Sequence, residues 1–290
     1  MKDSTAYRLF RVFNVVVLLV IVFVTFYPFL NMVAQSFSSE GNINSGKVNL
    51  IPLGFNLETY KVVMADSMFW TNYKNTVIYT VVATAISIVL TTFFAYALSK
   101  RRLKGRNLFI GIAVFTMFFN GGIIPNYVLI TSLGMKNTLW AIVLPNAISV
   151  FNLLIMKSFF ENMPEELEEA AAIDGLNTYG ILLRIVLPLS KAVLATMILF
   201  YAVVNWNSWF SAFLYLDKKE LFPVTIFLRN LIAGATSEGT SFGGSAENLT
   251  QIASNVKAVA MVLSVVPILC IYPFVQKYFV TGVMLGSVKQ

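Results

Sequence analysis

Two aromatic side chains and one amide side chain recur at every fourth position of one apolar stretch. They are Tyr201, Asn205 and Trp209. On a helix this spacing places them on one face. Aromatic rings can cover the apolar C–H faces of a sugar, and an amide can donate to and accept from its hydroxyls. The pattern indicates the lining of a sugar path. Helix packing with an asparagine bond between helices is the alternative.

A second group of polar residues lies where another apolar stretch is interrupted by Gly121, Gly122 and Pro125. An interrupted helix often lines a cavity when it lies within a membrane. We therefore take three residues beside the interruption as second-rank candidates for the same path: Asn120, Asn126 and Tyr127.

Residues for catalysis or metal binding are largely missing. The chain has no histidine and one cysteine, Cys270, so disulfides, Cys/His zinc sites and histidine-based catalysis are not expected. The segment from Gly41 to Val48 nearly fits the phosphate loop G-x4-G-K-[ST], but Val48 replaces the hydroxyl that would bind Mg²⁺. No apolar strand precedes it. We therefore expect a chain that is not an enzyme and that holds no metal and no cofactor.

The composition places these residues in a membrane. Hydrophobic residues make up 57% of the 290 residues and charged residues 12%, about half the charged fraction of a soluble domain. Long windows carry no charged residue, and a helix needs about 20 apolar residues to span a bilayer. We predict a single all-α integral membrane domain over residues 1–290 with six spans, near residues 12–34, 75–98, 108–131, 139–157, 190–214 and 258–279.

The positive charges indicate how the chain is oriented. The net charge of +7 could suggest nucleic acid, but Lys100, Arg101, Arg102, Lys104 and Arg106 cluster in the gap between two predicted spans. This is the pattern of cytoplasmic loops. We predict a multi-pass protein of the bacterial cytoplasmic (inner) membrane with both termini inside. Residues 35–74, with a helix near 57–64, and residues 215–257 are then outside, and no nucleic acid is bound.

One inner segment, residues 162–188, has the features of a short exposed helix. Pro164 suits the first helical position, and Glu165 and Glu166 suit the first turn. Three alanines follow, and Gly175 can adopt the left-handed conformation that ends a helix. A helix this thin lets another backbone come close, so it suits docking into a groove. A helix lying on the membrane surface is the alternative.

The spacing within this segment resembles the signature of ABC importer permeases. Seven positions over twenty residues follow the pattern EAA-x3-G-x9-I-x-L-P: Glu169, Ala170, Ala171, Gly175, Ile185, Leu187 and Pro188. Over roughly residues 12–286 the chain is similar to carbohydrate-uptake permeases of the maltose-importer type, and most to the branch that handles oligosaccharides and polysaccharides, which includes alginate importers. The segments that carry this resemblance are Phe118–Pro125, Leu153–Phe160 and Tyr201–Trp209. The resemblance implies a type I permease fold in which these residues, with Asp174, form a coupling helix that docks into the ATPase subunit.

The same resemblance implies the partners. They are a dimer of ABC ATPases that binds ATP and Mg²⁺, a second, non-identical permease subunit, and an extracytoplasmic solute-binding protein that delivers the carbohydrate. The Gly- and Ser-rich outer loop would contact the binding protein, with a slack linker as the alternative. Its candidate contact residues are Gly239, Ser241, Gly243 and Gly244.

A secondary transporter driven by an ion gradient is the alternative function. Such transporters usually place ionisable groups within the membrane for coupling. The cores of the predicted spans contain no Asp, Glu, Lys, Arg or His. The absence of these groups argues against an ion-coupled mechanism independently of the signature.

Overall fold

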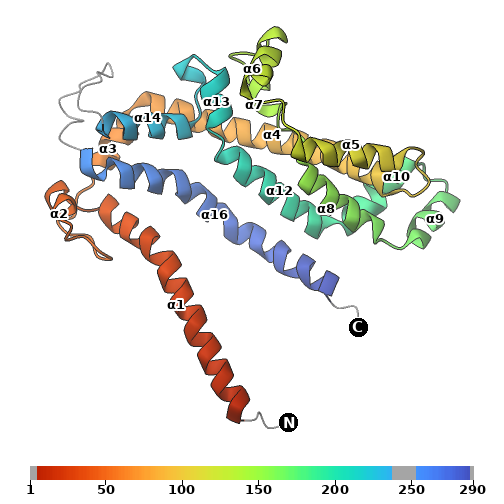
Figure 1. Ribbon diagram of the computed structural model, residues 1–290, viewed down its shortest axis with the longest axis horizontal. Helices are drawn as coiled ribbons and strands as arrows, with labels where there is room; N and C mark the ends of the chain where they lie inside the picture. Colours follow the sequence, from red (N-terminus) through yellow and green to blue (C-terminus); the bar gives the residue numbers. More distant parts are fainter. Residues whose placement is uncertain (1–4, 237–252, 288–290) are drawn as a thin grey trace. The chain divides into compact units, whose positions relative to one another are not determined.

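A computed structural model describes residues 5–236 and 253–287 (Figure 1). Within these ranges the regular elements are helices and no strand is present, as predicted. The chain divides into two compact units. Of the described residues, the first unit contains 5–69, 227–236 and 253–266, and the second contains 70–226 and 267–287. Each unit is described by itself below.

The first unit contains α1 (Thr5–Ser36), α2 (Glu40–Asn44) and α3 (Glu58–Ala65), together with most of α14 (Val224–Thr236) and the first part of α16 (Ala253–Ser287). Side chains along the apolar part of α1 are exposed within the chain. Hydrogen bonds hold the C-terminal end of α1. There the Asn31 amide donates to the carbonyls of Val48 at 3.1 Å and Asn49 at 2.8 Å. Helix α3 confirms the helix predicted near residues 57–64.

The second unit is built on α4 (Ser67–Ser99), whose first residues belong to the other unit. Its remaining elements follow in chain order: α5 (Arg106–Phe118), α6 (Ile123–Ser132), α7 (Trp140–Val143), α8 (Val150–Glu161), α9 (Glu165–Ile173), α10 (Thr178–Ile181), the π-helical turn η1 (Leu182–Val186), α11 (Leu187–Leu189), α12 (Lys191–Trp206), α13 (Phe210–Tyr215) and the 3₁₀ turn η2 (Lys219–Leu221).

One apolar cluster, here called the coupling core, holds the helices of the second unit together. It joins the end of α4 to α5, α8, α9, α10, η1 and α12. Its most buried members include Leu98, Leu153, Met156, Leu182, Val186 and Met197. These side chains are almost fully buried, so the cluster stabilises the packing of the helices that it joins.

The predicted spans are only partly continuous helices. Two helices of the described part, α1 and α4, are long and apolar enough to cross a membrane, and the number rises to four if two bent helix pairs each count as one span. The count of six therefore stays a prediction. The third predicted span is broken into α5 and α6 at an angle of 115°. Gly122, with φ 93°, permits the break, and the Asn120 side chain accepts a hydrogen bond from its N–H at 3.0 Å.

The fourth and fifth predicted spans are also not single helices. The fourth consists of α7 and α8, separated by residues 144–149, and the fifth consists of α12 and α13, separated by residues 207–209. The sixth lies within α16, although Pro267 and Pro273 fall inside that helix. Apolar composition predicted where these stretches lie, but it carries no information on where their hydrogen bonding is interrupted.

Candidate functional site

Helix α9 is the short helix predicted between the fourth and fifth spans. Pro164 lies at its N-cap rather than at the predicted first helical position, and in either place its missing N–H costs no hydrogen bond. At the other end Gly175 adopts φ +82°, as predicted. The N–H groups of Gly175 and Leu176 donate to the carbonyls of Ala172 and Ala171 at 3.1 and 3.0 Å, which is a Schellman ending.

The two faces of α9 differ sharply in exposure. Ala171 is 3% exposed and belongs to the coupling core. Ala170 and Ala172 are exposed, and Ile173 is 87% exposed on the same outer side as Ala170. Glu169, Asp174 and Gly175 are exposed as well. Of the signature residues on this helix, Ala171 therefore anchors α9 to its own chain, and the others remain free to meet a partner.

The rest of the signature lies in a bent helical segment. Ile185 and Leu187 pack against the coupling core, and Pro188 is exposed. Pro188 has no N–H to continue α-helical bonding, and the turn before it, η1, is π-helical. At the bend of 84° that follows, the buried hydroxyl of Ser190 donates to the Val186 carbonyl at 2.6 Å. The second half of the signature thus shapes the connection between α9 and α12.

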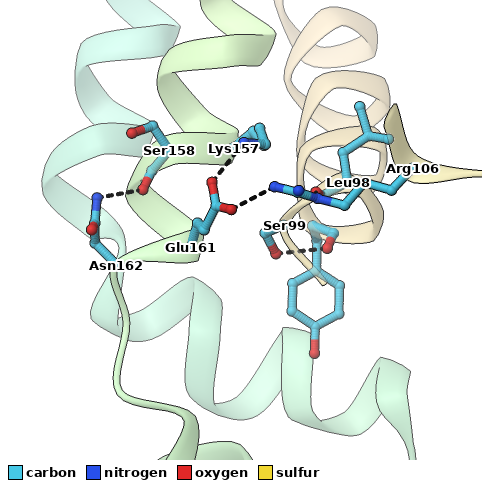
Figure 2. Close-up of polar contacts among 8 residues, drawn as sticks. Leu98, Ser99, Arg106, Lys157, Ser158, Glu161 and Asn162 are labelled. Carbon is cyan, nitrogen blue, oxygen red and sulfur yellow. Dashed lines mark hydrogen bonds and ion pairs between the residues drawn. The ribbon is translucent and has the colours of Figure 1, made fainter. Parts of the chain in front are cut away.

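Ion pairs connect the helix ends around α9. Arg106, at the start of α5, donates to the Leu98 carbonyl of α4 at 2.7 Å and to the Glu161 carboxylate of α8 at 2.5 Å (Figure 2). Lys157 donates to the other Glu161 oxygen at 2.6 Å. The hydrogen bond from Lys157 is the main cause that lowers the pKa of Glu161. Lys100, just after α4, pairs with Glu168 of α9.

These ion pairs border a recess of about 310 Å³. Its lining combines the basic run after α4 with the carboxylates of Glu161, Glu165, Glu168 and Glu169. The sequence showed the basic run only as a topology signal. Its pairing with α9 spans 68 residues of chain, and no local pattern reports a contact at that distance.

The proposed ladder on the fifth span is wrong in one member. Tyr201 and Asn205 lie on α12, but that helix ends at Trp206, so Trp209 is not on the same helical face. Tyr201 is 3% exposed. Its hydroxyl lies 2.7 Å from the Thr91 hydroxyl and accepts a hydrogen bond from the Ser149 N–H at 3.1 Å. Tyr201 therefore packs against α4 and the start of α8. Its place in a sugar path stays a prediction.

The second-rank candidates lie around the break between α5 and α6. The side-chain oxygen of Asn120 accepts from the Asn126 amide at 3.4 Å, and both residues are exposed. Tyr127 stacks on Tyr215 at 6.3 Å between ring centroids, with the Lys136 ammonium 5.5 Å above it. These three residues therefore lie on one bent segment, whereas Tyr201 and Asn205 lie on another helix.

The binding-protein candidates Gly239, Ser241, Gly243 and Gly244 lie outside the described residues. Within the described ranges, no group of three or more His, Cys, Asp or Glu side chains could hold a metal ion.

Comparison with known proteins decides the family. The chain is 40% identical over 265 residues to the polygalacturonan/rhamnogalacturonan transport system permease protein YtcP of Bacillus subtilis (strain 168), covering 90% of this chain and 92% of that protein. It is 30% identical over 267 residues to the probable ABC transporter permease protein YurM of the same strain, covering 91% and 83%. The chain belongs to the permeases of ABC transporters. No protein-family model matches it.

A solved structure agrees with this assignment. The permease superimposes on a chain of a bacterial ABC transporter involved in the import of the acidic polysaccharide alginate, with a TM-score of 0.86 and 34% sequence identity. The match covers 96% of this permease and 99% of that chain. Because its relatives are transport permeases, the protein is a membrane transport subunit and not an enzyme.

Proposed function

We propose that this permease forms half of the pathway by which an acidic oligosaccharide or polysaccharide enters a bacterial cell. The observation that carries the proposal is the likeness to the alginate importer over 96% of the chain. The relative named for polygalacturonan and rhamnogalacturonan transport supports the same substrate class, since both polymers contain uronic acids. In this proposal the permease lies in the cytoplasmic membrane with both termini inside.

The partners in this proposal are those of a binding-protein-dependent importer. Two ATPase subunits bind ATP and Mg²⁺, a second, non-identical permease completes the pathway, and an extracytoplasmic binding protein delivers the sugar. The permease itself holds no cofactor. The outer face of α9 is the docking surface for the ATPase, because it combines small alanines with the exposed Ile173 while Ala171 fixes its inner face.

Docking can be tested at Ile173. Replacing it by serine removes an apolar anchor that is 87% exposed within the permease. Truncating such an anchor typically costs about 1–2 kcal/mol of binding, which is about tenfold in affinity. We expect Ile173→Ser to weaken co-purification of the ATPase accordingly. Ile51→Ser is the matched control, because Ile51 is 72% exposed on a segment that is predicted to lie outside. Equal recruitment by both variants would refute docking through α9.

The substrate class is tested by uptake. Proteoliposomes that contain the whole importer, with its binding protein, should take up trigalacturonate when ATP is supplied inside, and should take up maltotriose more slowly. Faster uptake of the neutral sugar would refute the acidic assignment while leaving the permease role intact.

A further inference from the structure

The contact between Lys100 and Glu168 joins two helices whose roles differ. Lys100 directly follows α4, one of two helices in the described part of the chain that are long enough to span a membrane unaided. Glu168 lies on the inner side of α9, one helical turn before the buried Ala171. The lysine ammonium pairs with the glutamate carboxylate. The pair therefore bridges the proposed ATPase-docking helix and a long membrane helix.

The pair is less exposed to water than an ordinary surface pair. Each side chain is 19% exposed, so water screens the charges only in part. The Lys100 ammonium also lies 4.3 Å from the centroid of the Tyr96 ring. That ring packs edge-on against Phe160 of α8, 6.2 Å away. Lys100 thus contacts both a carboxylate and an aromatic ring.

The other cytoplasmic-side ion pairs connect different helices. Arg106 joins α5 to α8, and Lys157 with Glu161 lies within α8. Among the described residues, Lys100–Glu168 is the one ion pair that α9 makes with another helix. Helix α9 also contacts the unit through Ala171, through a hydrogen bond between Glu168 and Tyr96 of α4, and through the turn that leads to α10.

We propose that Lys100 is a positioning residue for energy coupling, and that its pair with Glu168 makes α4 follow the displacement of α9. This inference rests on the proposed function, because it takes α9 to be the helix that the ATPase moves. An ion pair between two helix ends resists their separation. When it is absent, α9 can move with the ATPase while α4 stays in place, and ATP is then hydrolysed without transport.

The test uses the complete importer in proteoliposomes with trigalacturonate as substrate. The variants are Lys100→Met, Lys100→Glu, Glu168→Lys and the charge-swapped double variant. Lys157→Met is the matched control, since Lys157 is a lysine of similar exposure, 16%, whose ion pair stays within one helix. ATPase recruitment, ATP hydrolysis, uptake and the thermal midpoint are measured for each.

We expect Lys100→Met to recruit the ATPase normally and to lower the sugar transported per ATP by about fivefold, at the low end of measured coupling effects. Lys100→Glu and Glu168→Lys should each lower the sugar transported per ATP further, and the charge-swapped double variant should restore it. Lys157→Met should match the unmodified importer. A merely structural role would lower the thermal midpoint without changing transport per ATP.

Three results would overturn the inference. In the first, Lys100→Met transports as much sugar per ATP as the unmodified importer. In the second, the charge-swapped variant recovers none of the sugar transported per ATP. In the third, Lys157→Met loses as much sugar transported per ATP as Lys100→Met. In each case the unmodified importer still recruits its ATPase and imports sugar, so the proposed function stands. An unmodified permease that recruits no ATPase would instead refute the proposed function itself.

Discussion

Two neighbouring alanines of α9 should lose different properties when each is replaced by tryptophan. Ala171→Trp should lower thermal stability, and Ala172→Trp should lower ATPase recruitment. Ala171 is 3% exposed within the coupling core, whereas Ala172 is exposed. Overpacking a core costs about 1–3 kcal/mol, and an indole at residue 171 should reach the upper value. At about 2–4 °C per kcal/mol, Ala171→Trp should lower the thermal midpoint by about 6–12 °C. A surface substitution such as Ala172→Trp should stay within about 0.5 kcal/mol, or about 2 °C.

Heating each purified variant in detergent and following the monodisperse fraction by size exclusion gives the midpoints. ATPase recruitment is measured on the same samples before heating. Ala172→Trp should fold normally and recruit poorly, because its bulk lies on the outer face of α9. Equal midpoints for the two variants, or a lower midpoint for Ala172→Trp, would refute the orientation of α9 on which the docking surface rests.

Other consequences can be checked by single substitutions. Tyr201→Phe leaves the Ser149 N–H without its acceptor, so it should lower the free energy of unfolding by about 1–3 kcal/mol, measured by thermal unfolding. An unchanged thermal midpoint together with lost sugar uptake would instead indicate that the Tyr201 hydroxyl binds the sugar. The pKa of Glu161 is held below its ordinary value of 4.5, so its stabilising effect is complete above pH 4.5 and is lost as the pH falls through the lowered pKa. The difference in thermal midpoint between the unmodified permease and Glu161→Gln should therefore be constant near neutral pH and should decrease at acidic pH. A difference that increases at acidic pH would contradict this prediction. Gly175→Ala places a Cβ at φ +82°, where it meets no neighbour, so circular dichroism melts should show only the backbone cost of about 1–2 kcal/mol.

Local chemistry predicted the site well where the cause is local. Glu165 and the alanines predicted α9, and the need for a left-handed residue predicted Gly175 at its end. The family followed from the spacing of a few residues along one chain segment. The Gly121–Gly122 pair likewise predicted an interruption, but not its angle of 115°, because packing against neighbouring helices sets that angle.

Features that depend on distant contacts could not be predicted in this way. Trp209 was placed on a helix that in fact ends at Trp206, since apolar composition continues across the break. The inward orientation of Ala171 depends on which helices surround α9. The pairing of Lys100 with Glu168 joins residues 68 positions apart, and only the folded arrangement brings them together.

The bend at Ser190 has a mechanical consequence. The segments Thr178–Leu189 and Lys191–Trp206 meet at 84°, and both pack in the coupling core, so they form an L-shaped lever. At 1.5 Å per residue the arms are about 18 Å and about 24 Å long. Rotation about the corner therefore magnifies a displacement only about 1.3-fold. Such a lever mainly changes the direction of a displacement. When the short arm, Thr178–Leu189, is displaced sideways, the end of α12 moves nearly at right angles to that displacement.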